Sequence, residues 1–212
     1  MFISPNVHTI FREFAGLYGI EADMGDLFEK LYRNSLNGDA DCGGLLAYGY
    51  YSGENITMIN EGRLAFLRTA NSNFNLANLM RVNLYTSLGA VKLGMDILMK
   101  DEGCKIDRLL GHGGFFKTKG VGQRFLAAAL NTPISVMETA GEGGAWGIAL
   151  LSAFQNRNPQ KLSLEDYLEQ VVFAGNKGTS VAPIAEDVAG FDKYTENYKR
   201  CLPIEQAAVD NK

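Results

Sequence analysis

Residues 111–118, which read GHGGFFKT, nearly match the phosphate-binding loop G-x-x-x-x-G-K-[ST]. In such a loop, backbone N–H groups wrap the phosphates, and this close approach requires glycine at the key positions. Phe116 stands where the second glycine belongs, and its ring would fill the space of a phosphate. We therefore reject a P-loop here and expect Lys117 to be a solvated surface lysine rather than a phosphate ligand.

A second glycine cluster, AGEGGAWG at residues 140–147, begins like the dinucleotide-binding pattern G-x-G-x-x-G. Trp146 occupies the place of the third glycine, so a Rossmann-type site is only weakly indicated. Each cluster follows an expected strand, at 105–111 or 133–138, and precedes an expected helix. Ligands bind at the carboxyl ends of adjacent parallel strands. Either the two turns grip a flat ligand together, or their glycines only allow close helix–strand packing.

The elements around these turns follow from hydrophobic periodicity and from helix start and stop signals. Helices are expected at residues 5–19, 24–36, 75–101 and 122–131, then from 145, at 163–170 and in the tail from Glu186. Further extended segments are expected at 43–51 and 63–69. The repeated order of strand, glycine turn and helix predicts an α/β fold that is helix-rich, with a small and mainly parallel sheet.

Composition restricts the classes of partner. The 212 residues are 46% hydrophobic and 21% charged, which suits one domain with ample material for a core. The net charge is −4 without a run of five basic residues, so neither nucleic acid nor an anionic membrane is expected as a partner. The longest apolar stretch, 145–154, is half a membrane span, and the N-terminus lacks a signal-peptide pattern. We therefore expect a soluble, cytoplasmic protein.

Metal and thiol chemistry is not indicated by the sequence. Cys42, Cys104 and Cys201 are far apart, without a C-x-x-C pair, and are expected to be reduced thiols. His8 and His112 are the only histidines in the chain. We therefore expect no zinc site, no Cys/His catalytic pair and no metal ligand.

Several motifs, in their order along residues 40–154, resemble the C-terminal, nucleotide-binding domain of the FGGY family of carbohydrate kinases. GGFFKT at 113–118 is similar to the family's Gly-Gly turn followed by Ser, Thr or Asn. EGGAWGIA at 142–149 is similar to its Glu-x-x-Ala-Leu-Gly-Ala-Ala turn. Upstream, ADCGGLL at 40–46 and YSGE at 51–54 are similar to the family's ADGLLFLPYLSGE. The resemblance implies an actin-like ATPase (RNase H-like) fold and a binding site for ATP.

The resemblance also implies which residues bind the nucleotide. They are Gly113, Gly114, Phe115, Thr118, Glu142 and Gly143. The first glycine turn would hold the nucleoside and inner phosphates, Phe115 and Phe116 would wall the pocket, and Thr118 would lie near adenine or ribose. Thr118 has an equal claim as the N-cap of a helix over 119–130. Glu142 is expected mainly to accept backbone N–H groups at a helix start, where a carboxylate is favoured.

Departures from the family pattern limit what the chain can do. The helix at 75–101 contains Arg81 but lacks the Glu and Gly that follow in the family, which indicates a divergent branch. The family's catalytic aspartate and its Asp-x-Gly-Thr phosphate hairpin have no counterpart, because the look-alike at residues 23–26 lies in a helical pattern. We therefore expect residues 1–212 to be one FGGY C-terminal domain, truncated and incomplete, with the sugar-binding N-terminal domain absent and no catalytic residue of its own.

The resemblance thus implies the nucleotide-binding half of an ATP-dependent kinase that phosphorylates a xylulose-like ketose or polyol, with Mg²⁺ accompanying ATP. The sugar would bind through the missing domain, so the isolated chain is expected to be inactive. The alternative is a non-catalytic actin-like module that senses nucleotide or binds a partner. A sheet edge or apolar face left uncovered would favour a homodimer.

Overall fold

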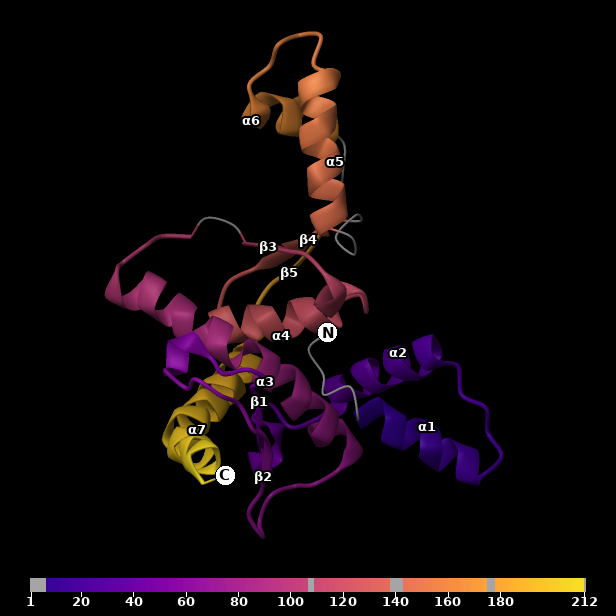
Figure 1. Cartoon of the computed structure of the whole chain (residues 1–212), viewed down its shortest axis with the longest axis vertical. Helices are drawn as coiled ribbons and strands as arrows, with labels where there is room; N and C mark the ends of the chain where they lie inside the picture. Colours follow the sequence, from indigo (N-terminus) through magenta and orange to yellow (C-terminus); the bar gives the residue numbers. More distant parts are fainter. Residues whose placement is uncertain (1–6, 107–108, 138–142, 175–177, 212) are drawn as a thin grey trace.

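The computed structural model describes residues 7–106, 109–137, 143–174 and 178–211, and Figure 1 shows how their elements are arranged. The first half of the chain contains α1 (Val7–Leu17), α2 (Met24–Asn34), β1 (Leu46–Gly49), β2 (Leu64–Leu67) and α3 (Leu76–Asp96). The second half contains β3 (Leu109–Gly111), α4 (Val121–Leu130), β4 (Ile134–Val136), α5 (Gly143–Asn156), α6 (Leu164–Tyr167), β5 (Thr179–Val181) and α7 (Ala185–Asp210). No described helix is both long and apolar enough to cross a membrane.

The small sheet next to both glycine turns has the strand order β3–β4–β5. β3 and β4 pair in parallel, with Leu109 opposite Ile134 and Gly111 opposite Val136, so their carboxyl ends finish level. This pair confirms the expected parallel strands. β5, which the sequence did not predict, pairs antiparallel with β4, so the sheet is mixed. β1 and β2 form a separate antiparallel ribbon.

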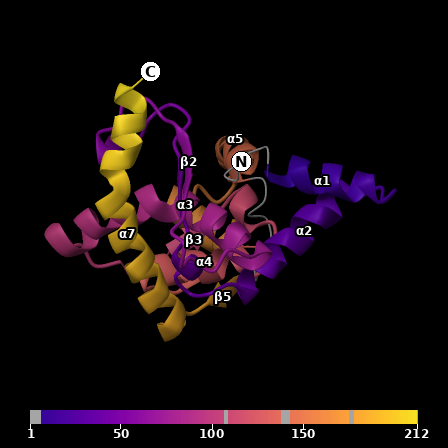
Figure 2. The ribbon, with the colours of Figure 1, turned by 90° about the horizontal axis from the view of Figure 1, so that it is seen from below.

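The core lies where α3, α4 and α7 pack together beside β1, as Figure 2 shows from below. Aromatic side chains dominate it. The ring of Tyr85 lies 4.4 Å from that of Phe191, and the ring of Tyr48 lies 4.8 Å from that of Tyr198, centre to centre. Gly89 lets Tyr198 approach α3, because a Cβ at position 89 would lie 2.8 Å from that ring. Burial of each such side chain stabilises the fold by roughly 1.5–3 kcal/mol.

Two helix starts test roles that the sequence suggested. The carboxylate of Asp23 accepts the backbone N–H of Asp26 at 2.9 Å and caps α2, so residues 23–26 belong to a helix rather than to a phosphate hairpin. The expected N-cap role of Thr118 is wrong, because α4 begins at Val121 and its cap is Gly120. Gly120 has a φ of 83°, a conformation that glycine adopts without steric cost.

Two parts of the chain project from the core in Figure 1. α5 and α6, with the segment that follows them, form an arm (residues 143–174) that extends beyond the sheet. α1 and α2 form a hairpin elsewhere on the molecule. The outer face of α1 is apolar, with Ile10, Phe14 and Leu17 each more than half exposed. The arm matters for the site because it begins directly after the second glycine cluster.

Candidate functional site

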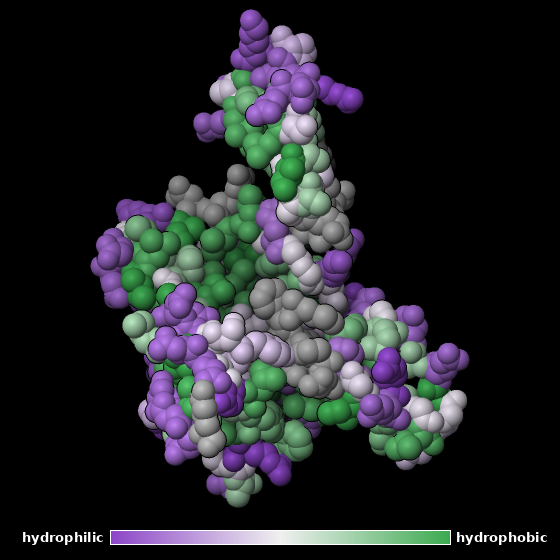
Figure 3. All heavy atoms as spheres, viewed as in Figure 1, coloured by the Kyte–Doolittle hydropathy of each residue, from purple (hydrophilic) through white to green (hydrophobic). Residues whose placement is uncertain are grey.

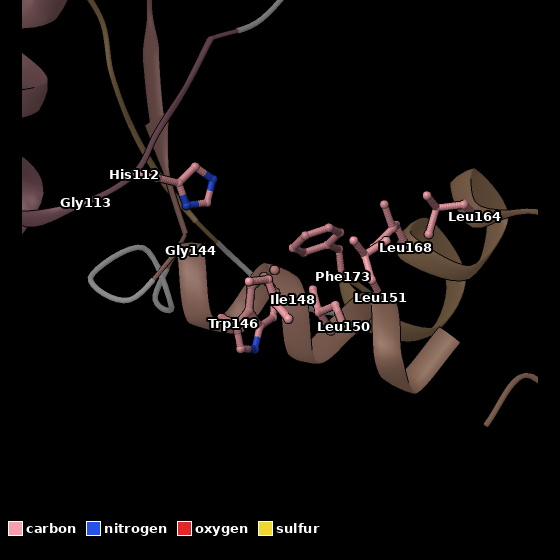
Figure 4. Close-up of a pocket in the computed structure, with 11 residues that line it drawn as sticks. His112, Gly113, Gly144, Trp146, Ile148, Leu150, Leu151, Leu164, Leu168 and Phe173 are labelled. Atoms are coloured by element: carbon pink, nitrogen blue, oxygen red, sulfur yellow. The ribbon is translucent and has the colours of Figure 1, made fainter. Parts of the chain in front are cut away.

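A cleft with a volume of about 740 Å³ lies between the arm and the turn that follows β3 (Figure 4). It is lined by His112, Gly113, Gly144, Trp146, Gly147, Ile148, Leu150, Leu151, Leu164, Leu168 and Phe173. In Figure 3, hydrophobic residues gather in the hollow beside the arm. Small ligands usually bind in concave, mainly apolar sites of this size.

Both glycine turns reach this cleft. Gly113 lies in the turn after β3, and Gly144 lies in the first turn of α5, which follows β4. Gly113 has a φ of 98° and a ψ of −176°, a conformation almost restricted to glycine. A Cβ at either glycine would meet no atom within 4 Å, so bare backbone is accessible at both turns. Described residues of both glycine clusters therefore line one cleft, while residues 138–142 of the second cluster lie outside the described part of the chain.

The walls of the cleft are apolar and aromatic. Trp146 on α5 packs edge-on against Phe173, with ring centres 5.7 Å apart. This contact joins the segment that follows α6 to α5. Leu150 and Leu168 extend the same surface. Figure 4 shows His112 directly after β3, across the cleft from the arm. The arrangement suits a flat hydrophobic group held between the arm and the turns.

A second cavity of about 640 Å³ adjoins the cleft and shares His112, Leu168 and Phe173 with it. Its lining is more polar and includes Glu165 and Glu169 on the outer part of the arm. The site therefore has one nearly apolar lobe, next to the glycine turns, and one acidic lobe.

The structure brings part of the expected nucleotide-binding set to the cleft. Gly113 lines it, and Gly143 begins α5 immediately before the lining residue Gly144. Gly114 is exposed, with open space where a Cβ would stand, but it is outside the lining of the cleft. Glu142 lies outside the described residues.

Phe115 and Thr118 lie away from the cleft. Phe115 is 6% exposed and packs into the hydrophobic core, where Gly122 lets α4 approach its backbone. Phe116 turns its ring back over Gly111, since a Cβ there would lie 2.6 Å from the ring. Thr118 is half-buried in the turn before α4. The two phenylalanines therefore fasten the first glycine turn to β3 and α4 instead of walling the cleft.

The aromatic wall is what sequence reasoning missed. The glycine pattern marks Trp146 only as a departure from a fingerprint, although the chain's single tryptophan beside a glycine turn is itself a signal of a ring surface near a ligand. Phe173 gives no such signal. Its position depends on a π-helical turn, Leu168–Val172, that continues α6 and is rare in proteins.

A buried ion cluster holds α4, the helix that follows the first glycine turn. Asp187, in the first turn of α7, accepts hydrogen bonds from Arg81 Nη2 and Arg124 Nε, each at 2.5 Å. The side chains of Asp187 and Arg81 are 3% and 1% exposed. Burial alone would raise the pKa of Asp187, but the hydrogen bonds from Arg124 and Arg81 outweigh burial and lower it. A charged carboxylate therefore joins α3, α4 and α7 at neutral pH.

Comparison with known protein families decides what this site belongs to. Residues 10–155 match the model of the C-terminal domain of the FGGY family of carbohydrate kinases. The chain belongs to the FGGY family. The match includes both glycine clusters and α5 almost to its end. It stops before α6, so Phe173, which lines the cleft, lies outside the matched range. No curated protein gives a significant sequence match to the chain.

Solved kinases share the fold of this FGGY domain. Xylulose kinase from Rhodospirillum rubrum superposes with a TM-score of 0.62 at 18% identity, covering 92% of this chain and 38% of the kinase. Gluconate kinase from Lactobacillus acidophilus gives 0.64 at 17% identity, covering 84% and 34%. Glycerol kinase from Plasmodium falciparum, solved with ADP, gives 0.61 at 14% identity, covering 96% and 37%. The FGGY chain thus spans between a third and two-fifths of the length of these kinases.

Proposed function

We propose that this FGGY domain forms the nucleotide-binding side of an ATP-dependent sugar kinase. The proposal depends on one observation: Gly113 and Gly144 present bare backbone beside the aromatic contact of Trp146 and Phe173 within a single cleft. The N-terminus of α5 favours negative charge, because its first backbone N–H groups have no partner within the helix. Phosphate oxygens suit that end of the cleft, and a nucleotide base suits the wall.

The two lobes of the site orient the nucleotide. Glu165 and Glu169 line the second cavity, and their negative charges repel phosphate from that lobe. The phosphates then lie against Gly113 and the start of α5, while the base lies against Trp146 and Phe173. This orientation directs the terminal phosphate toward the open side of the glycine turns.

Phosphoryl transfer requires positioning and charge stabilisation on both sides of the transferred group. Within the described part of the chain, no group of three or more His, Cys, Asp or Glu side chains is placed to hold a metal ion. Mg²⁺ would accompany the phosphates of ATP. The sugar, a ketose or polyol as in the xylulose and glycerol kinases of the same fold, would be bound by a further domain that faces the cleft. The part of this chain is to bind and orient the nucleotide.

Calorimetric titration of the chain with ADP and with MgATP tests this function, with two glycine substitutions as a matched pair. Gly113 and Gly103 both have positive φ, 98° and 65°, and open space where a Cβ would stand. Gly113 lines the cleft, whereas Gly103 is outside its lining. Substitution by alanine at either site costs roughly 1–3 kcal/mol of folding free energy through backbone strain.

We expect saturable binding to the unchanged chain and binding weaker by about tenfold, or about 1.4 kcal/mol, in Gly113→Ala. Gly103→Ala should bind as the unchanged chain does, because its strain lies outside the cleft. The proposal fails when the unchanged chain binds neither nucleotide, or when both variants lose affinity equally.

A further inference from the structure

The side chains that line the cleft proposed for the nucleotide contain little that could read the hydrogen-bonding edge of a base. Of the 11 residues that line it, three are glycines and seven carry aliphatic or aromatic side chains. Among these lining residues, His112 is the one whose ring can both donate and accept hydrogen bonds, and it lies at the strand end rather than on the wall. Apart from the indole N–H of Trp146, which can only donate, the wall offers a base ring surface and hydrocarbon.

We infer that this cleft recognises purine nucleotides as a class, by stacking on Trp146 and Phe173, rather than adenine by its edge. The inference rests on the proposed function. Stacking on an aromatic ring tolerates any base, because every base has a π-face. Strong discrimination between similar ligands arises where a site must hydrogen-bond a group that the wrong ligand lacks. An apolar wall imposes no such requirement.

Purines are favoured over pyrimidines by size. The two fused rings of a purine cover more of the surface formed by Trp146, Phe173 and Leu168 than a single ring does, and the stabilisation grows with the apolar area removed from water. The expected order is similar affinity for ADP, GDP and IDP, with CDP weaker.

The acidic lobe allows stacking to be distinguished from recognition of the edge of the base. A base that extended past Leu168 and Phe173 would meet Glu165 and Glu169, which accept hydrogen bonds from exocyclic amino groups. Adenine and guanine carry such a group and hypoxanthine does not. Recognition by the acidic lobe would therefore favour ADP and GDP over IDP, whereas stacking alone treats the three alike.

The test is calorimetric titration of the chain with ADP, GDP, IDP and CDP, together with the fluorescence of Trp146, the single tryptophan of the chain. The inference predicts dissociation constants for the three purine nucleotides within about tenfold of one another, and quenching of Trp146 by each. A preference for ADP greater than about tenfold over both GDP and IDP overturns the inference while the proposed function stands. Weaker binding of IDP alone by that margin also overturns it. If no nucleotide binds, both fail.

Trp146→Leu and Phe154→Leu separate stacking from the stability of the arm. Phe154 packs on Tyr167 with ring centres 5.4 Å apart. Both substitutions therefore break an aromatic contact between α5 and a later part of the arm, but Phe154 is outside the lining of the cleft. Trp146→Leu should weaken all three purine nucleotides by similar factors of about 5- to 150-fold. Phe154→Leu should leave binding within about twofold, with circular dichroism confirming that both variants fold. Equal effects of the two substitutions on affinity would overturn the inference.

Discussion

Replacement of Asp187 by asparagine is the sharpest test of what holds the core of this FGGY domain together. Asparagine keeps the size of the side chain but removes its charge and one of the two strong acceptor oxygens. Arg81, 1% exposed, would then be a buried cation without its carboxylate. That carboxylate links α7 to α3 and α4, in addition to the aromatic packing between these helices.

The expected cost follows from the surroundings of the two arginines. Breaking a buried ion pair by removing one partner costs about 3–5 kcal/mol. Arg81 keeps hydrogen bonds to the Tyr85 hydroxyl, at 2.8 and 3.1 Å, and to the carbonyl of Gly38 at 2.8 Å. Arg124 is 31% exposed, so water replaces part of what it loses. We therefore expect the lower end, about 3 kcal/mol, out of the 5–15 kcal/mol that domains commonly have.

Urea unfolding followed by far-UV circular dichroism at pH 7 measures this difference. Asp192→Asn is the matched control, since Asp192 also lies on α7 and pairs with Lys92 at 3.5 Å, but its side chain is 54% exposed. That variant should lose less than about 1 kcal/mol. A loss below 1 kcal/mol for Asp187→Asn, or equal losses in the two variants, would refute the assignment of the cluster as a main support of the core.

The pH dependence of the unfolding free energy tests the same cluster and has a defined sign. Hydrogen bonds from Arg124 and Arg81 outweigh the opposing effect of burial and lower the pKa of Asp187 below its ordinary value of 3.8. A lowered native pKa stabilises the fold above the ordinary value, and that stability is lost as the pH falls through the native pKa. The difference in unfolding free energy between the unchanged chain and Asp187→Asn should therefore shrink below about pH 4. A difference that is constant down to acid pH would contradict the cause.

Three further outcomes are expected. The carboxylate of Glu205 accepts the backbone N–H of Arg63 at 2.7 Å, and burial raises the pKa of Glu205. The contribution of Glu205 to stability therefore falls as the pH rises from 4.5 through the native pKa, and Glu205→Gln should lack that fall in urea titrations. Gln123→Leu removes amide hydrogen bonds to the carbonyl groups of Ile134 and Thr179, at 3.2 and 2.8 Å, and should cost roughly 1–3 kcal/mol by the same assay. The chain alone should show no sugar-stimulated ADP release in a coupled enzyme assay, because the catalytic aspartate is expected in another domain.

The helices and the pair of parallel strands could be predicted because their signals are local. Leu27, Phe28 and Leu31 recur at helical spacing, and the helix expected at 24–36 is α2 (Met24–Asn34) followed by a single tighter turn. The glycine clusters mark where two strands end, and the crossover through α4 allows those strands to pair in parallel. The neighbourhood of the two turns was therefore predictable without any contact information.

The rest depended on contacts between distant residues. β5 has three residues, too few to show a period, and it is held by its pairing with β4 and by the hydrogen bond from Gln123 to the carbonyl of Thr179, 56 residues away. Phe115 and Phe116 are adjacent in sequence, and only the turn around Gly113 decides that both rings fold inward, one into the core and one over β3. A pattern of residue types cannot tell such an inward ring from one that walls a pocket.

α4 connects the core to the cleft, because its faces serve both. Arg124 joins the helix to α7 through Asp187, Gln123 joins it to β4 and β5, and Gly122 gives room for the backbone of Phe115 in the first glycine turn. These are three consecutive residues, so a shift of the helix moves the ion cluster, the sheet and the turn together. A ligand that fixes the turn therefore also stabilises the core, by about 2.7 kcal/mol at a concentration one hundred times its dissociation constant. The geometry of the cleft and the stability of the domain in this way both depend on one helix rather than on two separate regions.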